Sequence, residues 1–401
     1  MYPLKPILVG LAALSLATGV QAAERIKVDV IKNPYGGSRN VPELSTNPDY
    51  IHAAGLERLI DEWGGDLVRP VQDIRLNPEQ ERQYGEWNRM ALANANFAER
   101  VRETLQDNMI TVGLEANCND LLGMLAGLKY DSEGNARRVG LVFFDSHGDF
   151  NTPETTLSGM LGGMPVAVAA GHALHNLRKT AGLEEPLPMS DIVWGGVRDL
   201  DPLEAARFGE HDAQQFSVSD IRELSPNLRA RIDALAERVD LIYVHVDMDV
   251  LDPAEVPGHG LTVPNGPTST DLAEAIALMF RNPKTVALGI ASTPAGSLDP
   301  DGVSRQAALN LTLGSPETIH LDLVRLALAS NARLAMVPMQ DFLGLGSEAR
   351  FNTPGTSAGN WRWRLRAPQL TTELCDNVAG MVRNSGRSPD DPATPDTRDA
   401  P

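Results

Sequence analysis

Short apolar runs alternate with helical patterns along most of this chain, and this order constrains its fold more than any other feature. Several runs carry hydrophobic residues at consecutive positions, as strands covered on both faces do. The expected strands are residues 26–31, 67–71, 110–114, 139–144, 192–195, 241–246 and 286–290, and the expected helices include 94–106, 120–128, 228–238 and 269–280. The repeated strand–helix order predicts an α/β fold in which helices flank a mainly parallel sheet.

The composition is that of a globular, acidic protein. Its 401 residues are 42% hydrophobic, and 35 basic against 53 acidic side chains give a formal net charge of −18. Such a charge repels phosphate backbones, so nucleic acid is not an expected partner. The 2 cysteines exclude a disulfide-dense scaffold and a cysteine-rich zinc module. The apolar runs are shorter than the roughly 18–20 residues of a membrane span, so no membrane association is expected after signal removal.

Both ends of the chain are set apart from the expected fold. Residues 1–22 carry one positive charge at Lys5, continue with an apolar stretch and end on Val20-Gln21-Ala22, a small-residue cleavage pattern. This arrangement predicts a signal peptide and an exported protein, periplasmic or secreted. An uncleaved membrane anchor is the alternative. Residues 388–401 are polar and rich in proline, which predicts a disordered tail.

Acidic side chains and a histidine follow two of the expected strands. Asp145, His147 and Asp149 come directly after strand 139–144, and Asp247 and Asp249 come after strand 241–246. A spacing of two places each set on one side of an extended segment. Carboxylates this close repel one another unless cations lie among them. The pattern favours two bridging divalent ions that activate a water, rather than helix capping by isolated aspartates.

The same residues carry a family resemblance over about 26–312. The chain resembles the arginase/agmatinase ureohydrolases, which are binuclear manganese enzymes of three-layer α/β/α fold, so residues 23–312 are expected to form such a domain. The matching motifs are Phe144-Asp-Ser-His-Gly-Asp149, Asn151-Thr-Pro153, Ser158-Gly159, Gly196-Val-Arg-Asp-Leu-Asp201 and His245-Val-Asp-Met-Asp-Val-Leu-Asp-Pro253.

The resemblance implies a role for each matching residue. Asp145 and Asp247 would bridge the two ions, Asp149 would bind one of them, and His147 and Asp249 would bind the other. Asp149 would also accept the proton of the attacking water. The remaining matches concern the substrate, because Asn151 and Ser158 correspond to contacts of an α-carboxylate and Asp201 to a contact of an α-amino group. These three residues favour an amino-acid substrate over a decarboxylated amine.

Three positions depart from the family pattern. Cys118 stands where the family has its first metal-binding histidine, and a thiolate opens zinc or iron(II) as alternatives to manganese. The other readings of Cys118 are an inert buried thiol and a disulfide with Cys375. Gly162 stands at the position of the proton-carrying histidine. Ala291 stands at the position of the glutamate that binds the guanidinium group, which a carboxylate partner would otherwise orient.

Two further histidines bear on these departures. His259 lies in Pro257-Gly-His-Gly260, on a loop that could reach the site, and is a candidate for the missing proton carrier. His245 shares the parity of Asp247 but lies one step deeper in its strand, so a packing or supporting role is expected for it rather than metal binding.

The end of the chain resembles a second family. Residues 313–387, including Val337-Pro-Met-Gln-Asp-Phe-Leu-Gly-Leu-Gly346, resemble the C-terminal end of 4-α-glucanotransferases (amylomaltases). There the segment supplies the last strand and helix of a (β/α)₈ barrel, and one such unit cannot close a barrel. An appended strand–helix fragment is therefore expected. Trp361 and Trp363, with neighbouring arginines, are expected to pack, and a sugar-stacking patch is the alternative.

The expected function is metal-dependent hydrolysis of a C–N bond in a guanidino or amino-acid substrate. The cofactor would be two divalent ions, with manganese favoured. An impaired relative that binds metal without turnover is the alternative, because Gly162 and Ala291 replace reactive side chains. A carbohydrate enzyme is suggested only by the C-terminal fragment. The sequence is compatible with a homo-oligomer and does not fix the substrate.

Overall fold

In a computed structural model, the chain is described over residues 25–36, 45–62, 65–106, 109–131 and 133–313, and over shorter stretches between 324 and 385. The expected signal peptide, 1–22, and the expected tail, 388–401, lie outside the described residues. The described residues divide into two compact units between Gly314 and Ser315.

The first unit is built on a parallel sheet of nine strands in the order β2-β1-β4-β9-β8-β5-β6-β7, with β3 also paired to β1. The strands are β1 (Ile26–Asn33), β2 (Gly65–Leu67), β3 (Gln72–Asp73), β4 (Ile110–Glu115), β5 (Val139–Phe144), β6 (Ile192–Gly195), β7 (Gln214–Phe216), β8 (Leu241–Asp247) and β9 (Thr285–Ala291). The predicted α/β fold with a mainly parallel sheet is thus confirmed.

The edges of the sheet differ from the prediction. The expected strand 67–71 is replaced by two short strands, β2 and β3, which both pair with β1. The proline at position 70 separates them, since it cannot donate a hydrogen bond to a sheet ladder. β7 was not expected, because Gln214-Gln-Phe216 has little apolar character. As an edge strand it pairs with β6 alone.

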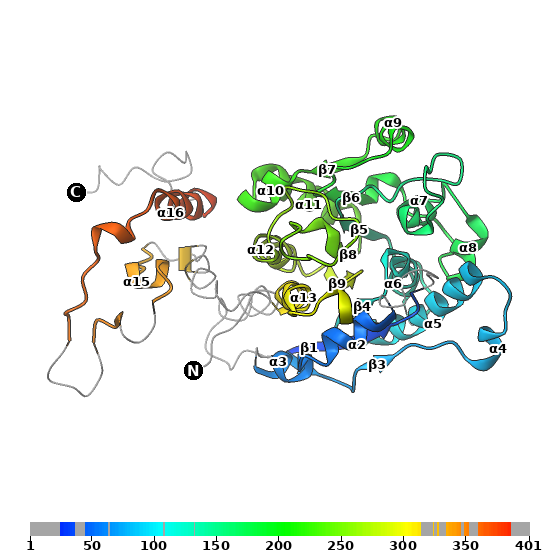
Figure 1. The fold of residues 1–401 in the computed structure, drawn as a ribbon, viewed down its shortest axis with the longest axis horizontal. Coiled ribbons are helices and arrows are strands. Elements are labelled where there is room, and N and C mark those ends of the chain that lie inside the picture. The colour runs from blue at the N-terminus through cyan, green and yellow to red at the C-terminus, as the bar shows by residue number, and fades with distance from the viewer. Residues whose placement is uncertain are drawn as a thin grey trace. The chain divides into compact units, whose positions relative to one another are not determined.

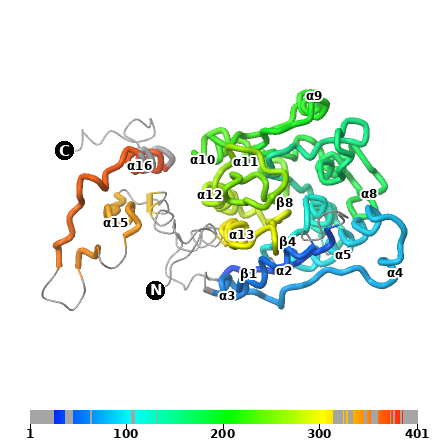
Figure 2. The backbone as a smooth tube through the Cα atoms, viewed as in Figure 1, coloured from blue at the N-terminus to red at the C-terminus, as the bar shows by residue number. Residues whose placement is uncertain are grey.

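Helices cover both faces of the sheet and complete the three layers (Figures 1 and 2). The helices of one layer are α2 (Asn47–His52), α3 (Leu56–Glu62), α10 (Val218–Glu223), α11 (Pro226–Arg238), α12 (Ser269–Met279) and α13 (Val303–Leu313). Those of the other layer include α5 (Glu86–Gln106), α6 (Leu121–Leu128), α7 (Pro165–Ala169) and α8 (His175–Thr180). Two short helices are α4 (Pro78–Glu81) and α9 (Pro202–Glu210).

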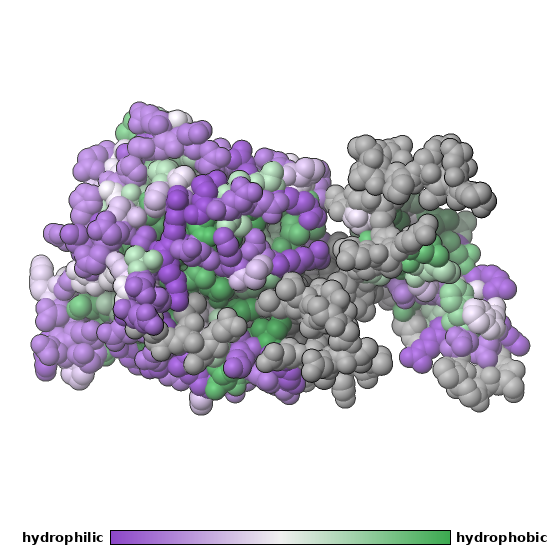
Figure 3. Space-filling model, turned by 180° about the vertical axis from the view of Figure 1, so that it is seen from behind, coloured by the Kyte–Doolittle hydropathy of each residue, from purple (hydrophilic) through white to green (hydrophobic). Residues whose placement is uncertain are grey.

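The central strands are buried on both faces, which explains their unbroken apolar sequences. Every residue of β5 is buried, and its side chains alternate between the two cores. Val142 and Phe144 pack with α11 and α12, whereas Leu141 and Phe143 pack with α5 and α6. The surface in turn is mainly hydrophilic on the face of the first unit that Figure 3 shows. No helix among the described residues has the length and apolar character needed to cross a bilayer.

The second unit is small in its described part. It contains α15 (Met339–Phe342) and α16 (Thr372–Asn384), and its core includes Val324, Leu328 and Met381. Its described residues hold helices and connecting segments but no strand. The ring of Phe351 stacks on Trp361 with their centroids 5.6 Å apart and meets Trp363 edge-on, while Trp361 itself is 65% exposed.

Truncation should separate the two units. A chain ending at Gly314 keeps α13, whose buried Ala308 and Leu311 belong to the larger core. We expect it to unfold at the same urea concentration as the full chain. A matched chain ending at Asp301 lacks α13 and should fail to fold, because the loss exposes that core. Circular dichroism in urea measures the unfolding of both chains. Aggregation of the chain that ends at Gly314 would contradict the boundary between the units.

Candidate metal centre

The carboxyl ends of four neighbouring strands, β4, β9, β8 and β5, form the edge at which the acidic residues gather. In parallel sheets this edge is where sites form. Asp247 is the last residue of β8, Asp145 follows β5, and Cys118 begins a short 3-10 turn after β4. The side chain of Asn117 accepts a hydrogen bond from the amide of Asn119 and so caps that turn. The strand order therefore brings together residues that are far apart in sequence.

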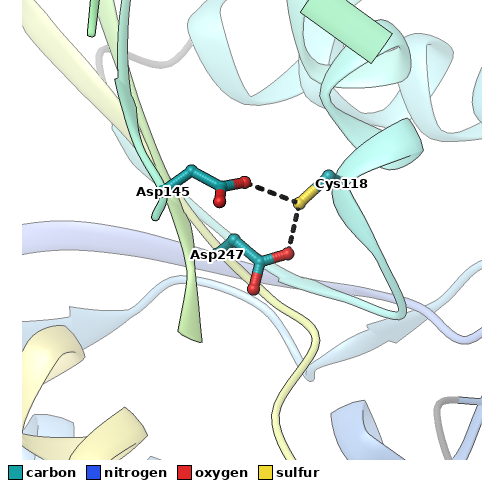
Figure 4. A group of neighbouring side chains, drawn as sticks. All are labelled: Cys118, Asp145 and Asp247. Atoms are coloured by element: carbon teal, nitrogen blue, oxygen red, sulfur yellow. Dashed lines mark hydrogen bonds between the residues drawn. The ribbon is translucent and has the colours of Figure 1, made fainter. Parts of the chain in front are cut away.

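The predicted ligands converge into one buried cluster. The thiol of Cys118 donates to Asp247 Oδ2 at 2.5 Å and lies 4.0 Å from Asp145 Oδ2, as Figure 4 shows. His147 Nδ1 lies 3.2 Å from Asp145 Oδ1 and 3.2 Å from Asp249 Oδ2. The carboxylates have almost no exposure, with Asp145 at 1% and Asp249 at 2%. These donors lie close enough to share cations.

The loop after β5 depends on a glycine. A Cβ at Gly148 would lie 2.7 Å from Glu204 Oε1 and equally close to the side chains of Leu200 and Phe208. The next residue, Asp149, adopts a left-handed backbone with φ 49°, and Glu204 of α9 accepts a hydrogen bond from the amide of Phe150. The loop is therefore held between β5 and α9, which fixes where Asp149 lies.

The electrostatics of the cluster call for positive charge. Burial and neighbouring carboxylates raise the pKa of Asp145, Asp149 and Cys118 well above their ordinary values. Burial acts against the charge on His147, but hydrogen bonds to Asp145 and Asp249 outweigh it and raise the His147 pKa to about 12. Burial likewise raises the Asp249 pKa, but His147 lowers it to about 2. The anions thus require cationic partners.

The donor set fits divalent metal ions. Carboxylate oxygens, imidazole nitrogen and one sulfur are the ligand types that manganese, iron and zinc accept. Asp149 Oδ2 is buried and has no hydrogen-bond partner in the described part of the structure, which leaves one lone pair available in the cluster. Ligand atoms of Cys118, Asp145 and Asp247 lie within 4.8 Å of one another. The residues present therefore suit a metal centre.

The three expected substrate contacts are found in different settings. The Asn151 side-chain amide donates to Asp201 Oδ2 at 3.1 Å, so the structure brings these two residues together. Asp201 also forms the capping box of α9 with Glu204. Ser158 is exposed, and its Oγ accepts a hydrogen bond from the amide of Met160. The structure therefore pairs Asn151 with Asp201, while Ser158 lies further along the same loop as Asn151 and forms its hydrogen bond there.

His259 reaches the cluster from the loop after β8. Its Nε2 lies 3.8 Å from Asp247 Oδ1, and only 9% of its side chain is exposed. Its Nδ1 accepts a hydrogen bond from the amide of Leu261 at 3.3 Å, which places the proton on Nε2 in the neutral ring. Arg198 holds the loop by donating to the carbonyl oxygens of Val263 and Pro264.

Two serines in the cluster were not expected from the sequence. Ser146 Oγ donates to Asp249 Oδ1 at 2.8 Å, and Ser292 Oγ donates to Asp247 Oδ2 at 2.8 Å. Ser292 follows Ala291 at the end of β9, so strand parity points it away from the site. Its positive φ of 61° turns the side chain back toward Asp247. The corner at which the family has a glutamate thus presents a hydroxyl.

A buried polar network lies one layer below the metal ligands. Glu115 of β4 reaches across β9 to β8, where it accepts from the Tyr243 hydroxyl at 3.0 Å and lies 3.1 Å from His245 Nδ1. A Cβ at Gly289 would lie 2.3 Å from the Tyr243 oxygen, and one at Gly113 would lie 2.6 Å from Glu115 Oε1. The glycines create the space for this network, and His245 belongs to it rather than to the groups of candidate ligands.

We expect the network to stabilise the fold. Replacing Glu115 with alanine leaves Tyr243 and His245 buried without their acceptor, which should lower the free energy of unfolding by about 2–5 kcal/mol. Glu223→Ala, at an exposed position of α10, serves as the matched control and should change it by less than about 0.5 kcal/mol. Urea unfolding followed by circular dichroism measures both. Equal urea midpoints for Glu115→Ala and the wild type would show that the network does not stabilise the fold.

The comparisons with known proteins agree with this geometry. A sequence model of the arginase family matches residues 27–313. The arginase of Bacillus caldovelox is 30% identical over 234 residues, which cover 56% of this chain and 76% of that protein. The arginase of Entamoeba histolytica is 32% identical over 255 residues, covering 60% and 81%. The crystal structure of Bacillus subtilis arginase superposes with a TM-score of 0.61 at 24% identity, covering 72% of this chain and 97% of that one.

A second match concerns the C-terminal region. A 4-alpha-glucanotransferase family model matches residues 299–371. Its first residues fall in the first unit, where Asp299 caps α13 by accepting from the amides of Ser304 and Arg305. The rest lies in the second unit. Since the arginase match spans most of the chain and the whole metal-ligand cluster, the protein belongs to the arginase family.

Proposed function

We propose that this protein is a ureohydrolase that uses two divalent ions to hydrolyse a C–N bond of a guanidino substrate. The observation that carries the proposal is the convergence of Cys118, His147 and three aspartates, Asp145, Asp247 and Asp249, in overlapping groups of ligand atoms, with Asp149 buried beside them. When bound, the ions would supply Lewis acidity and an activated water at neutral pH. Manganese is the proposed metal, and Cys118 extends the choice to zinc and iron(II).

Different residues of the chain would orient the water, transfer protons and bind the substrate. Asp149, whose Oδ2 is without a partner among the described residues, would orient the water and accept its proton. His259 would pass a proton between the cluster and the leaving amine, because its Nε2 faces Asp247 and its ring is nearly enclosed. The pair Asn151 and Asp201 would bind the polar head of an amino-acid substrate.

The substrate corner distinguishes this chain from a typical arginase. Ala291 is buried at the end of β9 and pairs with Asp247 across the sheet, so it offers no carboxylate to a guanidinium. The neighbouring Ser292 hydroxyl is committed to Asp247. This observation favours a second candidate function, a metal-binding relative that lacks turnover. We propose catalysis as the first candidate because Asp149 and His259 both face the cluster.

A substrate panel tests the proposal. Protein loaded with manganese, zinc or iron(II) is incubated with arginine, its decarboxylated amine and shorter guanidino acids, and urea is measured. Release of urea from at least one compound is expected, and Asp149→Asn should abolish it. Retention of two ions without any release would favour the metal-binding relative.

We also propose that the protein is exported, on the basis of residues 1–22. Expression with and without these residues, followed by cell fractionation and mass measurement of the mature chain, tests this. The expected result is a periplasmic or secreted chain beginning at Ala23. A chain that retains Met1 in the membrane fraction would indicate an anchor.

Asp247→Asn should have opposite effects with and without metal. The substitution removes a charge that would hold both ions, so metal content should fall from two ions to one or fewer. It also removes repulsion among the buried carboxylates, so the metal-free variant should melt no lower than metal-free wild type. Elemental analysis after gel filtration and calorimetry in chelator measure the two effects.

Asp233→Asn, on the exposed face of α11, is the matched control and should change neither quantity. A metal-free Asp247→Asn protein that melts well below wild type would indicate that Asp247 stabilises the fold through hydrogen bonds rather than through cations.

A further inference from the structure

The ligand atoms of the cluster separate by chemical type into two ends. The sulfur of Cys118 shares its neighbourhood with carboxylates alone. The imidazoles of His147 and His259 share theirs with carboxylates at the other end. The close groups are Cys118 with Asp145 and Asp247, His147 with Asp145 and Asp249, and His259 with Asp247 and Asp249. A pair of ions bound here would therefore lie in two different environments.

The sulfur end is enclosed. Cys118 is buried, and its turn is held by the Asn117 cap. Its sulfur meets Asp247 Oδ2 at 2.5 Å and Asp145 Oδ2 at 4.0 Å. Asp149 is the acidic neighbour whose Oδ2 is buried without a partner in the described residues. A position with one thiolate and carboxylates is suited to a borderline-soft ion such as zinc or iron(II).

The imidazole end has harder donors. His147 Nδ1 lies 3.2 Å from both Asp145 Oδ1 and Asp249 Oδ2, so the two aspartates contribute oxygen atoms here. The Asp145 carboxylate thus presents one oxygen to each end, as a bridging ligand must. Imidazole and carboxylate donors accept manganese as well as zinc. The preference for zinc over manganese should consequently be smaller at this end.

We propose that the two ion positions are not equivalent and that the centre is of mixed metal, with zinc or iron(II) at the Cys118 position and manganese at the His147 position. This inference rests on the metal centre of the proposed function, but not on the substrate or on turnover. The departure at Cys118 then has a chemical role. Its thiolate would select zinc or iron(II) for one position, whereas a centre built only from histidines and carboxylates would not distinguish the two ions.

Cobalt(II) reports directly on the sulfur position. Metal-free protein is titrated with cobalt(II) while the near-ultraviolet absorption is recorded. The first equivalent should produce a thiolate-to-cobalt charge-transfer band, and the second should add little to it. Cys118→Ser should lose the band, whereas Cys375→Ser, which alters the exposed second thiol, should keep it. Binding of the first equivalent without the band would overturn the proposal.

Competition between zinc and manganese tests whether the two positions select different ions. Metal-free protein is equilibrated with one equivalent of zinc and excess manganese, separated by gel filtration and analysed for both elements. One zinc and one manganese per chain are expected, with an electron paramagnetic resonance spectrum of isolated manganese. In Cys118→Ser the affinity for the retained zinc should fall by more than about 10-fold, since even a ligand's supporting partner typically contributes that much.

The outcomes separate this inference from the proposed function. A spin-coupled manganese pair, with zinc left in solution, would overturn the mixed centre while leaving the binuclear site intact. Failure of the protein to bind cobalt(II), zinc or manganese would reject the metal centre and the proposed function together. Absence of urea release with one zinc and one manganese bound would reject catalysis alone. Cys118→His offers a second variant, which should bind two manganese ions.

Discussion

Repulsion among four buried carboxylates is the constraint on which the rest of the site depends. Asp145, Asp149, Asp247 and Asp249 lie at or just after the ends of two strands that are direct neighbours in the sheet. A charge buried in this way is costly unless it is paired. Only a rigid support can hold such groups together, and the sheet supplies it because its central strands are covered by a core on each face. The cations of the proposed metal centre would complete the arrangement.

Two of the three departures from the family pattern, Cys118 and Ala291, lie at one corner of this support. Cys118 and Glu115 come from the end of β4, Ala291 and Ser292 from β9, and the network partners Tyr243 and His245 from β8. The β5 side keeps the predicted ligands Asp145, His147 and Asp149, but the third departure, Gly162, lies in the loop that follows them. A carboxylate inside the network is possible only because Gly113 and Gly289 leave room for it. The two departures therefore lie next to a buried polar network that is built from the same strands.

The sequence predicted those features that follow from strand register and missed those that depend on loops or on a neighbouring strand. Contiguous apolar runs identified β5 and β6 to the residue, and the spacing of two placed Asp145, His147 and Asp149 together. Parity could not place Ser292, because a positive φ reverses it. It could not foresee the Glu115 network either, since parity gives the face of a side chain but not its reach across a glycine in the next strand.

The location of the site decides what the second unit can contribute to chemistry. Every ligand and every supporting side chain described here lies between residues 115 and 292, within the unit that ends at Gly314. The glucanotransferase likeness begins at 299, after the last of them. A barrel enzyme draws its catalytic groups from the ends of several strands, and the described part of the second unit has none. The predicted ligands therefore lie in the arginase-family unit, and Cys118 and Ala291 are two positions at which that unit departs from the family pattern.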